Sequence, residues 1–314
     1  AGITTTWRCE APGIHTMRLI VHDDHHLQPT IHGESAHDRH WNVDEDTVTI
    51  ACFESPYQSV TQDPIVSTRP FTYTLVVRGN KGLTSSATGT VRVTMPVSAI
   101  IDPATVVCPD DGCSVDAAGQ NFTWDGQLSR DSEIRFTFAA TVDAENLLDV
   151  VLNAGGSPLL PIQAEIFDGL IDQTLSTTTP VIVKHVSPSS AAPGSTITYT
   201  TLVPANSTLT SQGDAEIFDF FEDNSLLPYL ALTDELTYPE GSQPPDFQRF
   251  SGQVSWNGSI QPGDALLVRY QVQISEALPS EFCGSVLTTN GQVSDGSVTS
   301  PSVNTSIPIT CAGN

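Results

Sequence analysis

The chain repeats one pattern of alternating segments twice, and this duplication constrains its fold more than any other feature. A Trp-x-Gly segment occurs at residues 121–128 and again at 253–260, and an alternating apolar run follows each copy. A matching Thr-Tyr-Thr segment precedes each of them, at 71–77 and 197–203. A repeated order over such a span is typical of a duplicated domain. It favours a structural array over a single active site.

The composition indicates many short strands. Aromatic residues make up 7% and charged residues 15% of the 314 residues, and Thr, Ser, Val, Gly and Pro are abundant. Such a mixture suits strands joined by turns and leaves little material for helices. The formal net charge of −24 repels phosphate groups. We therefore expect neither nucleic acid nor direct membrane insertion among its partners.

The six cysteines predict an oxidising, extracellular environment. They are even in number and lie as three pairs that are close in sequence, and no pair has the Cys-x-x-Cys spacing of a zinc site. The chain opens at Ala1-Gly2, which looks like the stump left by a removed secretory signal. A secreted or cell-surface protein is expected. Proximity predicts the pairs Cys9 with Cys52, Cys108 with Cys113, and Cys283 with Cys311.

Three blocks follow along the chain. Residues 1–64 form a His-rich N-terminal segment with strands expected at 16–21 and 47–52, and packing on the first sandwich is one arrangement open to it. Residues 65–178 and 179–314 form the two repeats. Period-two runs broken by Gly, Pro, Asn and Asp predict a tandem immunoglobulin-like β-sandwich, an all-β fold. Residues 172–180 are interpreted as a Thr-rich connector. Helix is expected only as single turns at 144–148 and 224–228.

The second repeat resembles the conserved-repeat module of bacterial and archaeal surface proteins, domain of unknown function eleven. The likeness runs over residues 183–200, through Trp256-Asn257-Gly258 to Pro262-Gly263-Asp264, and ends near 287–290. The middle of the match is loose, since 204–207 and 218–223 depart from the family pattern. The resemblance implies an immunoglobulin-like sandwich in an extracellular protein, and it supplies no catalytic residues.

The N-terminal block carries the main candidate for metal chemistry. Seven of the eight histidines fall between residues 15 and 40. Three imidazoles and two carboxylates within five residues offer enough donors for a divalent metal such as Zn²⁺ or Cu²⁺. A polar loop or an interface in which histidines pair with carboxylates is the alternative. The candidate ligands are His22, Asp23, Asp24, His25 and His26.

Other candidates are weaker. Acidic residues at 109–112 and 219–223 lack the spaced ligands of a calcium loop, so solvated turns are expected there. Trp124 and Trp256 are interpreted as core anchors, with sugar platforms as the alternative. Glycosylation sequons also occur. The candidate acceptors are Asn121, Asn206, Asn257 and Asn304.

These observations predict a secreted structural subunit of a filament or surface layer. Its partners would be copies of itself, joined when one protomer donates a strand to an open sheet edge of another. The candidate donor strand is Gly2, Ile3, Thr4, Thr5, Thr6 and Trp7. An adhesin or carbohydrate-binding module that binds glycans is the first alternative, and an extracellular metal-binding protein is the second. No enzyme motif is found, so we expect no enzymatic activity and no further cofactor.

Overall fold

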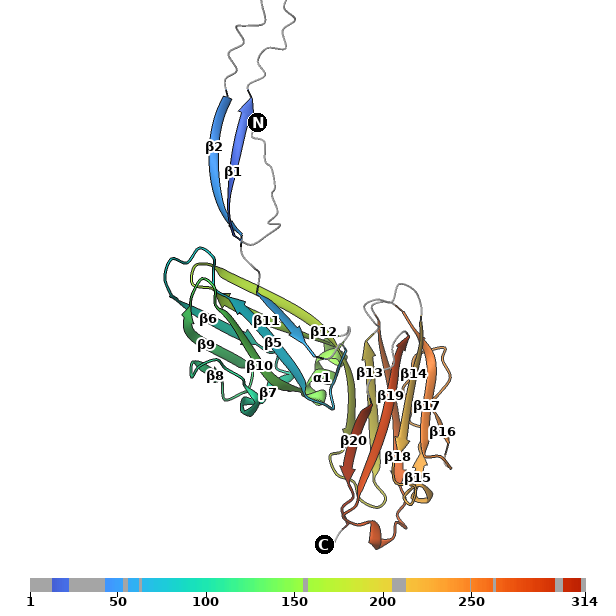
Figure 1. Ribbon diagram of the computed structural model, residues 1–314. Coiled ribbons are helices and arrows are strands. Elements are labelled where there is room, and N and C mark those ends of the chain that lie inside the picture. Colours follow the sequence, from blue (N-terminus) through green and yellow to red (C-terminus); the bar gives the residue numbers. More distant parts are fainter. Residues whose placement is uncertain are drawn as a thin grey trace, which may run out of the picture.

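The computed structural model describes residues 13–22, 43–52, 56–61, 64–154, 158–204, 213–248, 250–261, 264–296 and 302–311. The fold is all-β, and two immunoglobulin-like sandwiches follow each other along the chain (Figure 1). The fold class predicted from the period-two runs is therefore confirmed. The predicted His-rich extension lies mostly outside the described residues.

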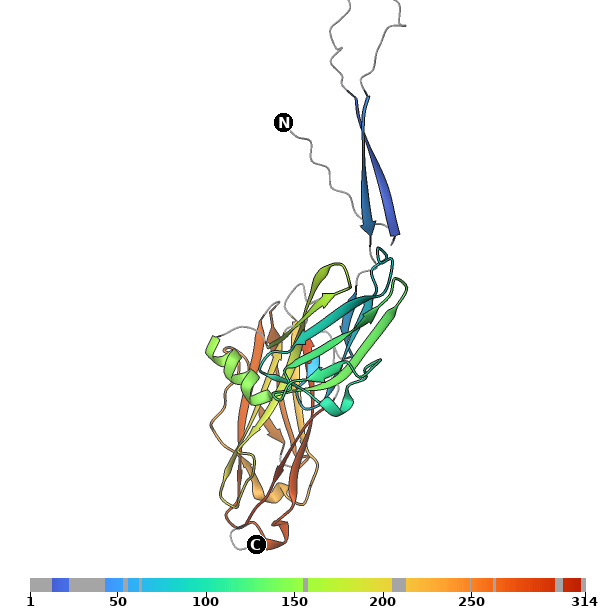
Figure 2. The ribbon, with the colours of Figure 1, turned by 90° about the vertical axis from the view of Figure 1, so that its left-hand side faces the viewer.

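A two-stranded hairpin precedes the first sandwich. It consists of β1 (Gly13–His22) and β2 (Val43–Cys52), which pair antiparallel over their whole lengths. Both expected strands of the N-terminal block are therefore present. The hairpin forms a sheet of its own and extends away from the sandwiches (Figure 2).

The first sandwich has two facing sheets. The four-stranded sheet has the order β3-β5-β10-β7, and the facing strands continue the order β12-β11-β6-β9-β8. The first sheet contains β3 (Tyr57–Val60), β5 (Phe71–Arg78), β7 (Ala99–Ile101) and β10 (Glu133–Val142). The second contains β6 (Ala87–Thr94), β8 (Cys113–Val115), β9 (Asn121–Leu128), β11 (Leu159–Phe167) and part of β12 (Asp172–Ser187).

The second sandwich repeats this plan. One of its sheets has the order β15-β18-β13-β12 and the other the order β16-β17-β14-β19-β20. The first contains β13 (Thr196–Pro204), β15 (Leu230–Leu232) and β18 (Ala265–Ile274) beside β12. The second contains β14 (Gly213–Phe221), β16 (Asp246–Gln248), β17 (Gln253–Ile260), β19 (Val286–Gly296) and β20 (Val303–Pro308).

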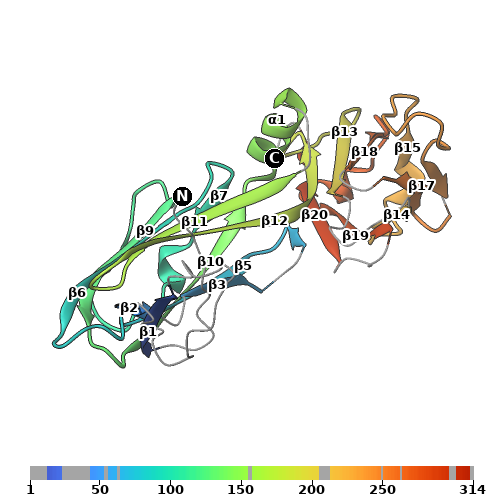
Figure 3. The ribbon, with the colours of Figure 1, turned by 90° about the horizontal axis from the view of Figure 1, so that it is seen from above.

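One strand belongs to both sandwiches. The first half of β12 pairs with β11, and its second half pairs with β13 and, in parallel, with β4 (Ile65–Val66). The interpretation of 172–180 as a connector is therefore wrong, and the boundary predicted between 178 and 179 falls inside a strand. Thr and Ser there alternate in exposure because one face of the strand covers the first core. Figure 3 shows β12 running from one sandwich into the other.

At the junction, β12 is buried on both faces. Val181 and Val183 pack into the first core, whereas Ile182 packs into a core of the second sandwich together with Val66 and Trp256. A strand with both faces covered reads as a continuous apolar run, and Val181-Ile182-Val183 is such a run. The two cores are therefore separated by the thickness of one strand.

The strand registers confirm the duplication. In each sandwich a fully buried tryptophan lies opposite an aliphatic residue of the neighbouring strand, and a buried tyrosine lies opposite an aromatic residue. Corresponding positions can therefore be read from the pairing of the strands. The pairs are Trp124 with Val91 and Tyr73 with Phe138 in the first sandwich, and Trp256 with Ile217 and Tyr199 with Tyr270 in the second.

The glycine of the Trp-x-Gly motif is required by the packing of the tryptophan ring in both copies. Trp124 and Trp256 are each 1% exposed, so the interpretation as core anchors is confirmed. A Cβ atom at Gly126 would collide with the ring of Trp124, and one at Gly258 would collide with the ring of Trp256. The glycine two residues on therefore makes room for the indole to fold back along its own strand.

The helix in the first sandwich is longer than the single turn that the sequence predicts. A helix, α1 (Ala144–Ala154), connects β10 to β11 and buries Leu147, Leu148 and Val151. The prediction of a single turn at 144–148 was wrong because the helical period continues through Val151. The second expected turn is present as the 3-10 segment Leu227–Tyr229, and two further 3-10 segments are Pro103–Thr105 and Ser280–Phe282.

Candidate functional site, a buried lysine, aspartate and tyrosine

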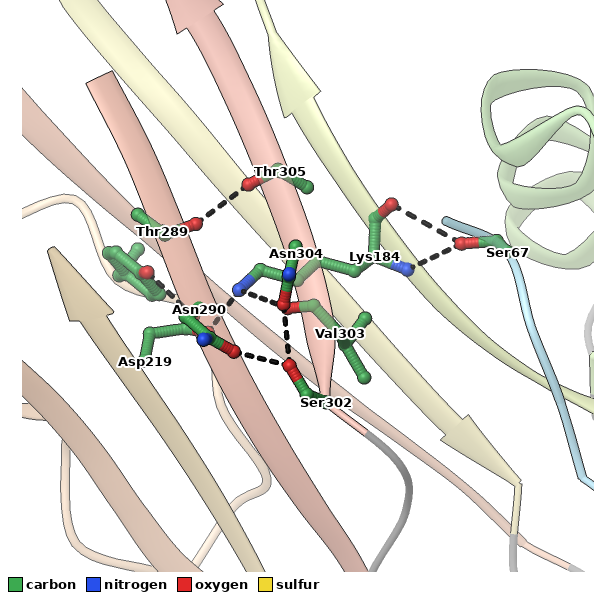
Figure 4. A network of polar contacts seen from close by, with 10 residues as sticks. Ser67, Lys184, Asp219, Thr289, Asn290, Ser302, Val303, Asn304 and Thr305 are labelled. Carbon is green, nitrogen blue, oxygen red and sulfur yellow. Dashed lines mark hydrogen bonds and ion pairs between the residues drawn. The ribbon is translucent and has the colours of Figure 1, made fainter. Parts of the chain in front are cut away.

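The most unusual chemistry lies inside the second sandwich. Lys184, on β12, is one of only two lysines in the chain and is 2% exposed. Its backbone is held by the Ser67 hydroxyl, which accepts from the Lys184 N–H at 3.0 Å and donates to the Lys184 carbonyl at 3.3 Å. The side chain extends from this point into the sandwich (Figure 4). Ser67 follows β4, so the first repeat helps to place a residue of the second.

The lysine meets an aspartate from the opposite sheet. Asp219 lies on β14 and is 1% exposed, because the alternation of this strand points it inward with Ile217 and Phe221. Lys184 Nζ donates to Asp219 Oδ1. The Tyr270 hydroxyl, on β18, donates to Asp219 Oδ2 at 2.7 Å. The two oxygens of one carboxyl group therefore have different donors.

Space for this contact comes from a glycine on β19. Gly291 lies opposite Asp219 in the strand register. A Cβ atom at Gly291 would collide with Asp219 Oδ1 and would lie 2.9 Å from Lys184 Nζ. On the neighbouring strand, the Val303 carbonyl lies 3.4 Å from Nζ and accepts a second hydrogen bond. The site is therefore shaped by three strands of one sheet and by Lys184 and Tyr270 from the other.

Further polar residues surround the site in Figure 4. The hydroxyls of Thr289 and Thr305 are hydrogen-bonded to each other at 2.7 Å across β19 and β20. On the other face of these strands, the Ser302 hydroxyl lies within hydrogen-bond distance of the amide oxygens of Asn290 and Asn304. These bonds fasten β20 to β19 beside the lysine.

Two stacked tyrosines form one wall of the site. The rings of Tyr199 and Tyr270 have centroids 5.1 Å apart and an interplanar angle of 15°. Burial raises the pKa of the Tyr270 hydroxyl well above its usual range, and the charge of Asp219 raises it further. Burial also raises the pKa of Tyr199, with a smaller contribution from Asp219. The Tyr199 hydroxyl is buried without a hydrogen-bond partner in the described part of the chain.

The first sandwich has no charge at the corresponding positions. In the strand register, Lys184 corresponds to Gln58. Lys184 lies two residues before the partner of Tyr199, and Gln58 lies two residues before the partner of Tyr73. Asp219 corresponds to Val93, and Tyr270 to Phe138. Val93 and Phe138 are buried in an apolar core. The sandwich fold therefore does not itself require a buried ion pair.

Sequence reasoning missed this site. The sequence predicts a solvated turn at 219–223, and this is wrong for Asp219, because it is the inward residue of β14, whereas Glu222 and Asp223 follow the strand. The usable signal was the position of Lys184 directly after an apolar run and the alternation of Ile217, Asp219 and Phe221. Both predict a charged side chain that points into a core.

The other acidic spot is a turn, as expected. Asp110 Oδ1 accepts hydrogen bonds from the backbone N–H of Gly112 at 3.0 Å and from Trp124 Nε1 at 2.8 Å. The carboxylate therefore closes the loop and satisfies the buried indole. Among the described residues, no group of three or more His, Cys, Asp or Glu side chains is placed to hold a metal ion.

Two of the three predicted disulfides are present. Cys108 is bonded to Cys113, and Cys283 to Cys311, with Cα atoms 6.1 and 5.5 Å apart. The third pairing lies outside what the structure describes, because Cys9 falls in the residues before β1.

The remaining predicted sites are only partly placed. His22 ends β1, and the other candidate metal ligands, Asp23 to His26, lie outside the described residues. The candidate donor strand, residues 2–7, also lies outside them. Of the sequons, Asn121, Asn257 and Asn304 lie on β9, β17 and β20, while Asn206 is outside the described ranges. Metal binding, strand donation and glycosylation stay predictions.

Comparisons with known proteins found distant structural likenesses and no sequence relative. No protein family and no curated protein matches the sequence. Similar solved structures include the C-terminal domain of the Streptococcus agalactiae antigen I/II polypeptide BspA, with 8% identity, a TM-score of 0.32, and coverage of 80% of this chain and 99% of that one. The C-terminal domain of the Streptococcus pyogenes antigen I/II-family protein AspA has 10% identity, a TM-score of 0.30, and coverage of 79% and 98%.

The collagen adhesin of S. aureus is also similar, with 11% identity, a TM-score of 0.25, and coverage of 80% of this chain and 91% of that one. At such identities and TM-scores these likenesses carry no argument about function. The described residues contain no helix that is long and apolar enough to span a membrane.

Proposed function

We propose that the chain is a structural subunit of an extracellular filament or surface layer. The observation that carries this proposal is the shared strand β12. Its sixteen residues pair with strands of both sandwiches, and at the junction each face of the strand packs into a different core. A junction of this kind resists bending, since any hinge motion would break the strand pairing and expose apolar side chains.

An extracellular location has independent support. Two disulfides are present, and disulfides persist in oxidising compartments. The net charge of −24 keeps densely packed copies soluble by mutual repulsion. Both features suit a protein that is exported and held at high local concentration.

Assembly by strand donation needs an open sheet edge. Within the two sandwiches, the edge strands β3, β7, β8, β15 and β16 have three or four residues each, which is too short for a long added strand. The edge strand β20 has six residues. We therefore infer that an N-terminal strand from another copy, residues 2–7, pairs with β20.

Negative-stain microscopy of the secreted protein tests this proposal. The full chain should form filaments or sheets, and deletion of residues 1–8 should leave a folded monomer with unchanged circular dichroism. A control that replaces residues 1–8 with an equally long Gly/Ser segment should also stay monomeric. Filaments formed by the deleted protein would rule out this donor. A full chain that stays monomeric and binds glycans saturably would support the adhesin alternative instead.

A further inference from the structure

We propose that Lys184 and Asp219 become joined by an amide bond between Lys184 Nζ and Asp219 Cγ. The protein would form this bond by itself after folding, and it would link β12 covalently to β14 across the second sandwich. The site is a modification site made only of this chain's own residues. The inference does not depend on polymerisation, because it concerns a single folded chain.

The first argument is the environment of the two groups. The side chain of Lys184 is 1% exposed and that of Asp219 is 2% exposed, and they approach each other from opposite sheets. Removing an ammonium and a carboxylate from water carries a large desolvation cost, and attraction between the charges repays it only with good geometry and further hydrogen bonds. Conversion to a neutral amide removes both charges from the core.

The contacts match the steps of amide formation. A proton passes from Nζ to Oδ1 along their hydrogen bond, which gives a neutral amine and a carboxylic acid. The Nζ lone pair then attacks Cγ, and negative charge develops on Oδ2. The Tyr270 hydroxyl donates to Oδ2 and stabilises that charge, as oxyanion-hole donors do.

The reaction balances without any other reactant. The Cγ–Oδ1 bond breaks, Oδ1 takes a second proton from Nζ, and one water molecule leaves. One carbon–nitrogen bond has then replaced one carbon–oxygen bond, and nothing is oxidised or reduced. Burial favours the forward direction because little water is present to reverse it, and because the reacting groups are already held together.

The product would keep its polar atoms paired. Oδ2 becomes the amide oxygen and still accepts from Tyr270, while the remaining N–H on Nζ faces the Val303 carbonyl, now 3.4 Å away. Gly291 leaves the space that the reacting groups occupy. In the first sandwich, Gln58, Val93 and Phe138 occupy the corresponding places, so the reactive set is specific to the second repeat.

Digestion with trypsin tests the bond directly. An unmodified Lys184 is cleaved, so the fully denatured and reduced chain would give peptides 136–184 and 185–249. An amide at Nζ blocks this cleavage. We expect one peptide, 136–249, that is lighter than its sequence by one water molecule, and fragment spectra that place the link between Lys184 and Asp219. Cleavage after Lys81 serves as the internal control.

Variants separate the amide from an ion pair. Lys184→Arg and Asp219→Ala should each abolish the water loss, and Tyr270→Phe should slow it or reduce the linked fraction. If the single variants fail to fold, the combination Lys184→Gln, Asp219→Val and Tyr270→Phe provides a folded chain with the residues of the first repeat. Normal cleavage after Lys184 once the folded wild-type protein has been denatured and reduced, with no mass loss, would show an ion pair only and overturn the proposal.

Discussion

Individual residues explain why the repeat was visible in the sequence and the site was not. Trp124 and Trp256 need a glycine two residues on, so the motif survives in both copies and predicts their burial. Lys184, Asp219 and Tyr270 have no such partner within the sequence. They meet only because β12, β14 and β18 are brought together by the fold, and the first repeat has uncharged residues in their places. Local patterns therefore revealed the scaffold but not the chemistry.

The buried tyrosines predict a loss of stability at high pH. Burial raises the pKa of Tyr73, Tyr199 and Tyr270 above the usual value of 10.0. The folded chain therefore keeps these protons at a pH where the unfolded chain releases them. Stability is full below pH 10.0 and falls as pH rises beyond it, by about 1.4 kcal/mol per pH unit for each tyrosine. Urea midpoints measured at increasing pH check this slope.

Tyr199→Phe is a matched variant for this experiment. Its hydroxyl has no described partner, so the variant should be at least as stable as the wild type near neutral pH and should show a shallower loss above pH 10.0. An ultraviolet absorbance titration in which every tyrosine ionises near pH 10.0 while the circular dichroism stays native would contradict the prediction.

At the scale of elements, the sequence predicted which alternating runs form strands better than it predicted which strands pair with each other. The runs around both tryptophans form strands as expected, but residues 172–180 were interpreted as a connector. A stretch rich in Thr and Ser matches either a linker or a strand with one exposed face. Only its pairing with β11 decides between them, and this pairing is not visible in a local pattern. The helix α1 was underestimated because only its first turn was recognised.

The two described disulfides should stabilise the fold by different amounts. Cys283 and Cys311 are 28 residues apart, whereas Cys108 and Cys113 are 5 residues apart. Loop-closure entropy then predicts a loss of about 3.6 kcal/mol when the first pair is replaced by serines and about 2 kcal/mol for the second. Denaturant unfolding of the two double variants measures both. Equal losses would show that chain entropy does not control these effects.

The whole molecule is a tandem pair whose duplication could be read from the sequence and whose junction could not. The continuous strand β12 and the contribution of Ser67 to the placement of Lys184 tie the second sandwich to the first. Two domains connected by a loose linker unfold independently. Domains that share a buried strand lose part of each core when either one opens. The observed junction therefore predicts one coupled unit.

We expect calorimetry to show a single unfolding transition for both sandwiches. Insertion of a flexible Gly/Ser segment after Pro180, within β12, should uncouple the sandwiches and split the transition into two. The matched control places the same segment after Gly241, where the backbone has φ +83° and nothing lies within 4 Å of an added Cβ atom. That insertion should leave one transition, since loops tolerate added length. Two transitions in the wild-type chain would show that β12 does not couple the cores, and would remove the physical basis for a rigid structural subunit.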